Sequence, residues 1–169
     1  MDLEQFVLAH EPAIRLGFFA GVFAIVALWE LAAPRRALTV SKALRWGSNL
    51  GLVALTTLVL RLMFPLAAVG VAAFGVANGW GLLNHFEVPF WLAVPLAVIG
   101  MDFVIWLQHV MVHAVPALWR LHQVHHADLD YDLTTGARFH PIEIALSMLI
   151  KFATITVLGP PVLAVVIFE

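Results

Sequence analysis

Residues 91–126 read WLAVPLAVIGMDFVIWLQHVMVHAVPALWRLHQVHH. The first part of this stretch is apolar, and the second part contains five of the eight histidines in the chain: His109, His113, His122, His125 and His126. On helices, the first two lie one turn apart on one face, and the last three form an i, i+3, i+4 stripe. Pro116 breaks the helical pattern between the two groups, so the second stripe can fold back on the first. This arrangement predicts a metal site made of imidazole nitrogens.

The composition of the chain is that of a membrane protein. Hydrophobic residues make up 62% of the sequence and charged residues 12%, and the mean hydropathy is +0.95. The net charge of −2 and the absence of a Lys/Arg run argue against a nucleic-acid partner. The sequence has no cysteine, so disulfides and thiolate metal sites are excluded. Any metal must be bound through nitrogen or oxygen.

Four apolar segments are long enough to cross the bilayer as helices: 13–33, 49–76, 89–108 and 142–168. The second segment is long and is expected to tilt or break near Pro65, and the last contains Gly159-Pro160-Pro161 and is expected to be bent or re-entrant. We therefore predict an all-α, multi-pass transmembrane helical bundle, with a single domain over 1–169. Because the sequence ends within an apolar run, we expect this domain to be incomplete at its C-terminal end.

The distribution of charge predicts the orientation in the membrane. Residues 34–48 contain four basic side chains and no acidic one: Arg35, Arg36, Lys42 and Arg45. The positive-inside rule then places this segment in the cytoplasm and the N-terminus outside. The third span returns the chain to the cytoplasm, so the histidine site is expected on the cytoplasmic side.

The number of histidines indicates which metal they bind. Five nitrogen ligands exceed the four of a closed zinc site, which favours two ions with open positions for oxygen or substrate. Two irons fit this donor set best. Neither histidine group contains the glutamate of His-Glu-x-x-His, so the pattern does not indicate a metalloprotease.

Three segments carry a family resemblance: DFVIWLQHVMVH (102–113), LWRLHQVHH (118–126) and TTGARFHPIE (134–143). They resemble the fatty acid hydroxylase/sterol desaturase superfamily of integral-membrane di-iron oxidoreductases. The resemblance implies hydroxylation or desaturation of a lipid C–H bond, in a sterol or a fatty acyl chain, with O2 and an external electron donor. It implies that the five clustered histidines are metal ligands, that His140 adds another, and that no further catalytic residue is needed. Family members carry a third histidine box after the last spans, so the chain is expected to be truncated before that box.

Other charged residues near the histidines have predicted roles as well. Asp102 lies on the same predicted helix face as His109 and is expected to bind a ligand histidine or carry protons, with a salt bridge to Arg61 as the alternative. Asp128 belongs to a loop that is expected to be solvated, and it is a second candidate for contact with a ligand histidine. Arg120 and Arg138 are expected to contact lipid headgroups or a redox partner, or to be ordinary positive-inside residues.

Two other classes of function remain open. The metal could staple a non-catalytic membrane scaffold, or the histidines could carry ions or protons in a transporter. A transporter places ionisable groups near the middle of several spans, whereas these histidines cluster at one end of a span. The sequence therefore favours the oxidoreductase.

Overall fold

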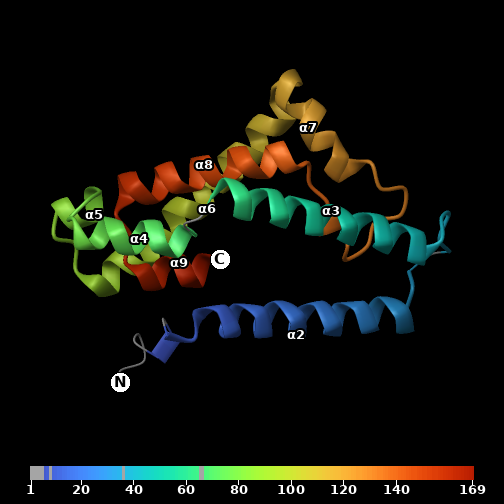
Figure 1. The fold of residues 1–169 in the computed structure, drawn as a ribbon, viewed down its shortest axis with the longest axis horizontal. Coiled ribbons are helices and arrows are strands. Elements are labelled where there is room, and N and C mark those ends of the chain that lie inside the picture. Colours follow the sequence, from blue (N-terminus) through green and yellow to red (C-terminus); the bar gives the residue numbers. More distant parts are fainter. Residues whose placement is uncertain (1–5, 8, 36, 65–66) are drawn as a thin grey trace. The chain divides into compact units, whose positions relative to one another are not determined.

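The computed structural model describes residues 6–7, 9–35, 37–64 and 67–169 (Figure 1). Over these residues the chain forms helices and no strand, which confirms the predicted all-α fold. The labelled elements are α2 (Glu11–Ala32), α3 (Lys42–Met63), α4 (Ala68–Ala77), α5 (Leu82–His85), α6 (Phe90–Ala114), α7 (Pro116–His126), the 3-10 helix η1 (Thr135–Ala137), α8 (Pro141–Leu158) and α9 (Val162–Phe168).

Among the described residues, four segments are long and apolar enough to cross a membrane: α2, α6, α8 and the run Lys42–His85, which contains α3 to α5. Many large apolar side chains on these helices are exposed, as expected for surfaces that face lipid. The chain is an integral membrane protein. The break expected near Pro65 lies outside the described residues.

Two helices extend beyond the apolar segments from which they were predicted. α3 begins at Lys42 rather than at Asn49, because its polar first turns make hydrogen bonds to the 128–138 loop. α6 continues past Gln108 to Ala114 and so carries His109 and His113 on its last turns. Hydropathy alone locates the apolar part of a helix. It misses polar turns whose side chains form hydrogen bonds with other parts of the protein.

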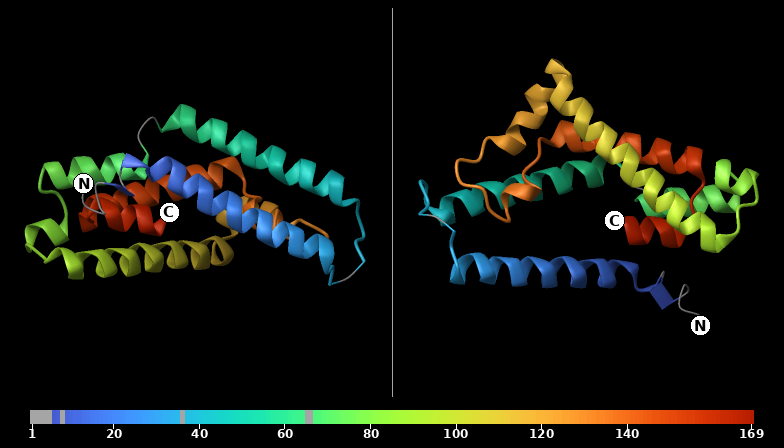
Figure 2. Two further views of the ribbon diagram at one scale, coloured as in Figure 1. Left: turned by 90° about the horizontal axis from the view of Figure 1, so that it is seen from below. Right: turned by 180° about the vertical axis from the view of Figure 1, so that it is seen from behind.

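The chain divides into two compact units. The first contains residues 1–12, 64–111 and 146–169, and the second contains residues 13–63 and 112–145. The first unit has an apolar core of mainly small side chains from α4, α6, α8 and α9: Ala68, Ala72, Ala97, Met101, Ile155, Ala164 and Val165. Because alanines let backbones approach closely, α4 and α9 lie side by side (Figure 2).

Two glycines meet at the end of α8. The helix stops at Leu158, Gly159 has a φ of +64°, and α9 begins after Pro160 and Pro161. Gly81, with a φ of +91°, packs directly against Gly159, and a Cβ on either residue would collide with the backbone of the other segment. The chain reversal therefore depends on glycine at both positions.

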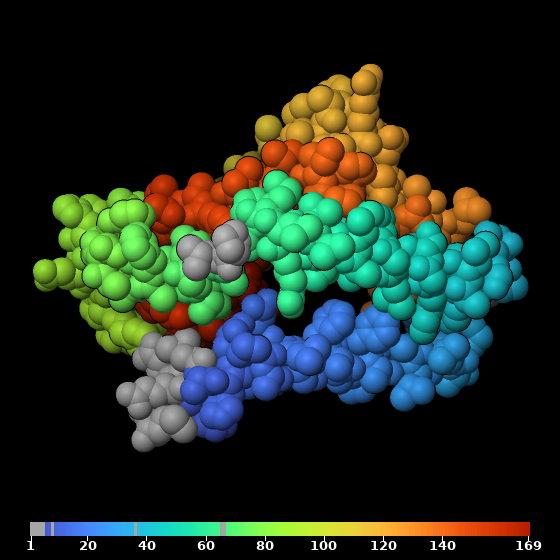
Figure 3. All heavy atoms as spheres, in the orientation of Figure 1, coloured from blue at the N-terminus to red at the C-terminus, as the bar shows by residue number. Residues whose placement is uncertain are grey.

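The second unit has a mainly polar interior. Its buried residues include nine that are polar or charged: Arg45, Asn49, Thr56, His122, Asp130, Asp132, Thr134, Thr135 and Glu143. In the space-filling view, open space remains between α2 and α3 (Figure 3). Hydrogen bonds and ion pairs, more than apolar packing, hold this unit together.

Candidate metal centre

The first two histidines lie on the last turns of α6. His109 and His113 are one turn apart on this continuous helix. After Ala114 the chain changes direction, because Val115 is extended (φ −96°, ψ 116°) and Pro116 opens α7 at a position where its missing N–H costs nothing. The sequence predicted this break correctly.

α7 turns its histidines toward His113. The ring centroids of His113 and His122 lie 4.7 Å apart, and those of His113 and His126 lie 5.0 Å apart. The Nε2 atoms of His122 and His126 are separated by 3.2 Å. Imidazole nitrogens from α6 and α7 therefore converge in one place, as the spacing predicted.

His122 is fully buried and is held by a carboxylate. Its Nδ1 lies 2.7 Å from Oε1 of Glu143, on the first turn of α8. Because an ionised carboxylate only accepts hydrogen bonds, this contact keeps the proton on Nδ1 and leaves the Nε2 lone pair for the cluster. Sequence reasoning did not assign Glu143 a role. The signal that was available is a glutamate three residues after His140, inside the segment that resembles the family.

His125 is fixed by a ring and a carbonyl group. Its imidazole stacks on Phe139 with centroids 4.5 Å apart and planes 4° apart, and its Nδ1 lies 3.3 Å from the carbonyl oxygen of Arg138. Burial lowers the pKa of His125, and the nearby rings of His126 and His122 lower it further, which outweighs the opposite effect of the carbonyl. Burial and the nearby rings of His122 and His113 also lower the pKa of His126. Both rings therefore favour the neutral form, which is the form that binds metal.

Trp119 forms a wall beside the cluster. Its indole lies 5.4 Å from the ring of His113 and 5.5 Å from that of His126, measured between centroids. A cavity of about 300 Å³ is lined by His113, Ala114, Pro116 and Trp119. Trp119, for which the sequence predicted no role, borders both the cavity and the histidines.

The remaining histidines are His140, His10 and His85. Nδ1 of His140 accepts a hydrogen bond of 3.2 Å from the backbone N–H of Ile142, at the beginning of α8. None of the ring contacts described above involves His140, so its role as a ligand stays a prediction. His10 and His85 belong to the first unit.

Asp128 does not contact a histidine in the described structure, contrary to expectation. Its carboxylate accepts hydrogen bonds from Arg45 at 2.6 and 2.8 Å, from Asn49 at 2.9 Å and from Thr135 at 2.7 Å. Burial alone would raise the pKa of Asp128, but these hydrogen bonds outweigh burial and hold it well below its ordinary value. Asp128 thus binds α3 rather than the histidine cluster.

The three aspartate side chains of this loop, Asp128, Asp130 and Asp132, are buried, not solvated as predicted. Asp130 accepts hydrogen bonds from the backbone N–H groups of Thr39 and Val40 at 2.8 and 3.1 Å. Asp132 accepts from Trp46 Nε1 at 3.0 Å and pairs with Arg45 at 2.8 Å. The loop after α7 is therefore fastened to the linker before α3 and to the first turns of that helix.

The two arginines predicted to face lipid headgroups differ from each other. Arg120 is exposed on α7. Arg138 donates from Nε to the carbonyl oxygen of Val124 at 2.9 Å and from Nη1 to Oδ1 of Asn49 at 3.1 Å, so internal partners occupy much of its guanidinium group. Asp102 is exposed on α6, in the first unit, and its predicted role stays a prediction.

Comparison with known proteins agrees with the predicted resemblance. The chain is 30% identical to alkylglycerol monooxygenase of Xenopus tropicalis over 123 residues, which are 69% of this chain and 27% of that protein. It is 35% identical to alkylglycerol monooxygenase of Homo sapiens over 69 residues, 41% of this chain and 16% of that protein. The chain thus spans about a quarter or less of the length of these relatives. No solved structure matches it. Residues 94–169, which hold both histidine groups and Glu143, match the model of the fatty acid hydroxylase family.

Proposed function

We propose that this chain is part of a membrane-bound, non-haem di-iron oxygenase that hydroxylates a lipid with O2 and electrons from an external donor. One observation carries the proposal. The imidazoles of His113, His122 and His126 converge from two helices, and a buried carboxylate orients the central one. All of these residues lie in the segment that matches the fatty acid hydroxylase family.

The clustered imidazole nitrogens are suitable ligands for a metal ion. Three rings with adjacent nitrogens cannot all be protonated, because like charges this close oppose one another. With neutral rings, the Nε2 atoms of His122 and His126, 3.2 Å apart, can share one proton or bind one cation. We propose His113, His122 and His126 as ligands, together with His109, His125 and His140, and two irons as the metal.

Iron held by histidine supplies the activation of O2 that an unactivated C–H bond requires. The residues of this chain provide placement. Glu143 keeps the proton on Nδ1 of His122, while Phe139 and the carbonyl group of Arg138 fix the ring of His125. Rings that are held in place lose less entropy when they bind a metal.

The cavity beside His113 is the proposed position of the carbon that reacts. Pro116 and Trp119 give it an apolar wall next to the histidines. An alkyl chain fits such a wall better than a polar group. Because the relatives are alkylglycerol monooxygenases, an alkylglycerol is the first substrate to test, and hydroxylation is favoured over desaturation.

Contacts within the second unit support a proposal for the side of the membrane on which the site lies. Thr39 and Arg45, in and after the basic linker, are hydrogen-bonded to Asp130 and Asp128, which follow α7. The linker and the loop after the histidines are therefore on the same side of the membrane. By the positive-inside rule, we propose that this side is the cytoplasm.

The test combines metal analysis with turnover. The protein, expressed in its longest available form and purified in detergent, is expected to contain iron with the Mössbauer signature of a coupled pair. It is also expected to consume O2 and to hydroxylate an alkylglycerol when a reductant is supplied. His122→Ala is expected to lose iron and turnover together. His85→Ala, which changes an exposed histidine of the first unit, is the matched control and is expected to retain both.

Other results would contradict the proposal in recognisable ways. The protein could bind metal tightly, show no turnover on any lipid and unfold when the metal is removed. This result would indicate that the metal only stabilises the fold. Iron content unchanged by His122→Ala would show that the clustered imidazoles are not ligands.

A further inference from the structure

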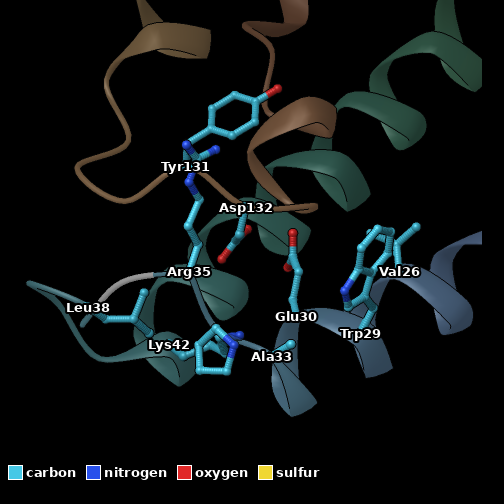
Figure 4. A pocket seen from close by; sticks show the side chains of 10 residues that line it. Val26, Trp29, Glu30, Ala33, Arg35, Leu38, Lys42, Tyr131 and Asp132 are labelled. Atoms are coloured by element: carbon cyan, nitrogen blue, oxygen red, sulfur yellow. The ribbon is translucent and has the colours of Figure 1, made fainter.

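A second cavity lies in the second unit, away from the histidines. It has a volume of about 730 Å³ and is bordered by the end of α2, the linker to α3 and the loop after α7 (Figure 4). Its lining combines apolar, aromatic and charged side chains, among them Trp29, Glu30, Arg35, Lys42, Tyr131 and Asp132. None of these residues takes part in the proposed oxygenase centre.

The charges of the lining are not balanced within the protein. Asp132 is neutralised by Arg45, with N and O atoms 2.8 Å apart, and also accepts a hydrogen bond from Trp46. Arg35 is exposed and has no ion-pair partner among the described residues, and Lys42 lies 5.4 Å from the centre of the Trp46 ring. Two cations are thus available to an anionic group in the cavity.

Glu30 indicates which kind of polar group the ligand of this cavity carries. Its Oε1 accepts a hydrogen bond of 2.9 Å from the backbone N–H of Leu133. Its Oε2 is buried and has no hydrogen-bond partner within the described part of the chain. A buried carboxylate oxygen of this kind favours a ligand that brings a hydrogen-bond donor, such as an ammonium or hydroxyl group.

The surroundings of the cavity indicate that its ligand is a lipid. The cavity lies where α2 ends and α3 begins, and both helices belong to candidate membrane spans. Val26, Trp29 and Leu38 give it an apolar side. An acyl chain can lie along these apolar side chains, at the end of a candidate span.

We propose that this cavity binds a phospholipid whose headgroup carries a hydrogen-bond donor, such as phosphatidylethanolamine. Arg35 and Lys42 bind the phosphate, since cations close to a membrane surface attract phosphate groups. Glu30 accepts the hydrogen bond of the ammonium group. The acyl chains lie along the apolar side of the cavity, and the proposal does not depend on the oxygenase function.

The experiment compares two lipids that differ only in three methyl groups. Phosphatidylethanolamine or phosphatidylcholine is added to the detergent-solubilised protein, and bound lipid is measured by native mass spectrometry. Since a hydrogen bond to a charged group contributes roughly as much as a tenfold change in affinity, the wild-type protein is expected to favour phosphatidylethanolamine by about fivefold to tenfold. Wild-type protein treated with a photoreactive phosphatidylethanolamine is expected to be labelled within residues 26–42 or at residues 131–132.

Three variants separate the two parts of the site. Arg35→Gln with Lys42→Gln is expected to weaken binding of both lipids by about tenfold. Glu30→Gln is expected to weaken phosphatidylethanolamine binding more than phosphatidylcholine binding, and so to abolish most of the preference. Arg61→Gln, an exposed cation at the other end of α3, is the control and is expected to bind like the wild type. Circular dichroism checks that each variant keeps its helices.

Several outcomes would overturn the proposal. Equal affinity of the wild type for the two lipids would remove the role of Glu30, and unchanged binding by the folded double variant would remove that of the cations. Displacement by glycerophosphoethanolamine, which has no acyl chains, at the same concentration as the lipid would show a site for a soluble phosphate ester. Cross-links only outside residues 26–42 and 131–132 would place the lipid elsewhere.

Discussion

Nδ1 of His122 lies 2.7 Å from Oε1 of Glu143, and both side chains are buried. The pair joins the end of α7 to the first turn of α8 within the second unit. A histidine whose second nitrogen is held by a carboxylate has a fixed tautomer and a fixed ring plane. The strength of metal binding at this cluster should therefore depend on a residue that is not itself one of the proposed ligands.

The first prediction concerns Glu143. Glu143→Gln is expected to weaken metal binding by roughly tenfold to a hundredfold, because the amide can no longer hold the Nδ1 proton as a charged acceptor does. The measurement is a titration of the purified, metal-stripped protein with Fe(II) or Zn(II). Glu87→Gln, which alters an exposed glutamate of the first unit, is the control and is expected to titrate like the wild type. Equal affinity in the two variants would mean that the contact with Glu143 does not organise the site.

The second prediction concerns the pH dependence of stability. Hydrogen bonds from Arg45, Thr135 and Asn49 outweigh burial and lower the pKa of Asp128 in the folded protein. The unfolded chain has an ordinary aspartate pKa of about 4, so it binds more protons than the folded chain as the pH falls through this range. The stabilisation is therefore present above pH about 4 and is lost progressively at lower pH.

The Asp128→Asn variant tests this directly. It is expected to lose about 2 kcal/mol of stability at neutral pH, because buried Arg45 loses its charged hydrogen bonds to Asp128 and keeps only Asp132 as an anionic partner. It is also expected to show a flatter decline of the melting temperature in detergent between pH 6 and pH 3, values chosen to bracket the ordinary carboxyl pKa. Asp102→Asn changes an exposed aspartate and should reproduce the wild-type curve. A variant curve parallel to that of the wild type would show that Asp128 does not carry the acid sensitivity.

The third prediction concerns Gly159. A side chain at this position is strained by the φ of +64° and would also collide with the backbone of Trp80. Gly159→Ala is expected to destabilise the protein by roughly 2 kcal/mol or more. Gly79 has a φ of +66° but open space around its Cα. Gly79→Ala should therefore show only the backbone cost of about 1 kcal/mol, and an equal loss in both variants would argue against the close approach of the two segments.

The histidine cluster was predictable because its determinants are local. His109 and His113 are one helical turn apart, and Pro116 separates them from the stripe on α7, so periodicity and one helix breaker were sufficient. Apolar length likewise identified the spans. Each of these signals lies within a window of a few helical turns.

The partners of the polar residues were not predictable, because they are distant in the sequence. Asp128 looked like a loop residue exposed to water, yet its partners Arg45 and Asn49 lie on α3, about 80 residues earlier. No periodic pattern connects a loop carboxylate to a helix at that separation. Glu143 escaped notice for a related reason, since its helix follows a loop whose course only the folded chain defines.

The last prediction concerns the sides of the membrane. Thr39 and Asp130 are hydrogen-bonded through the backbone N–H of Thr39 at 2.8 Å, so the linker before α3 and the loop after α7 must share one side. The chain contains no cysteine, which allows single cysteines to be introduced at exposed positions and labelled in intact cells with a reagent that does not cross membranes. Ala37→Cys and Tyr131→Cys are expected to be protected together, and His85→Cys, at the far end of the next span, is expected to react. Protection of only one of the first two would contradict the hydrogen bond between the linker and the loop. Reaction of both, with protection of His85→Cys, would keep that contact and place the histidine cluster outside the cytoplasm.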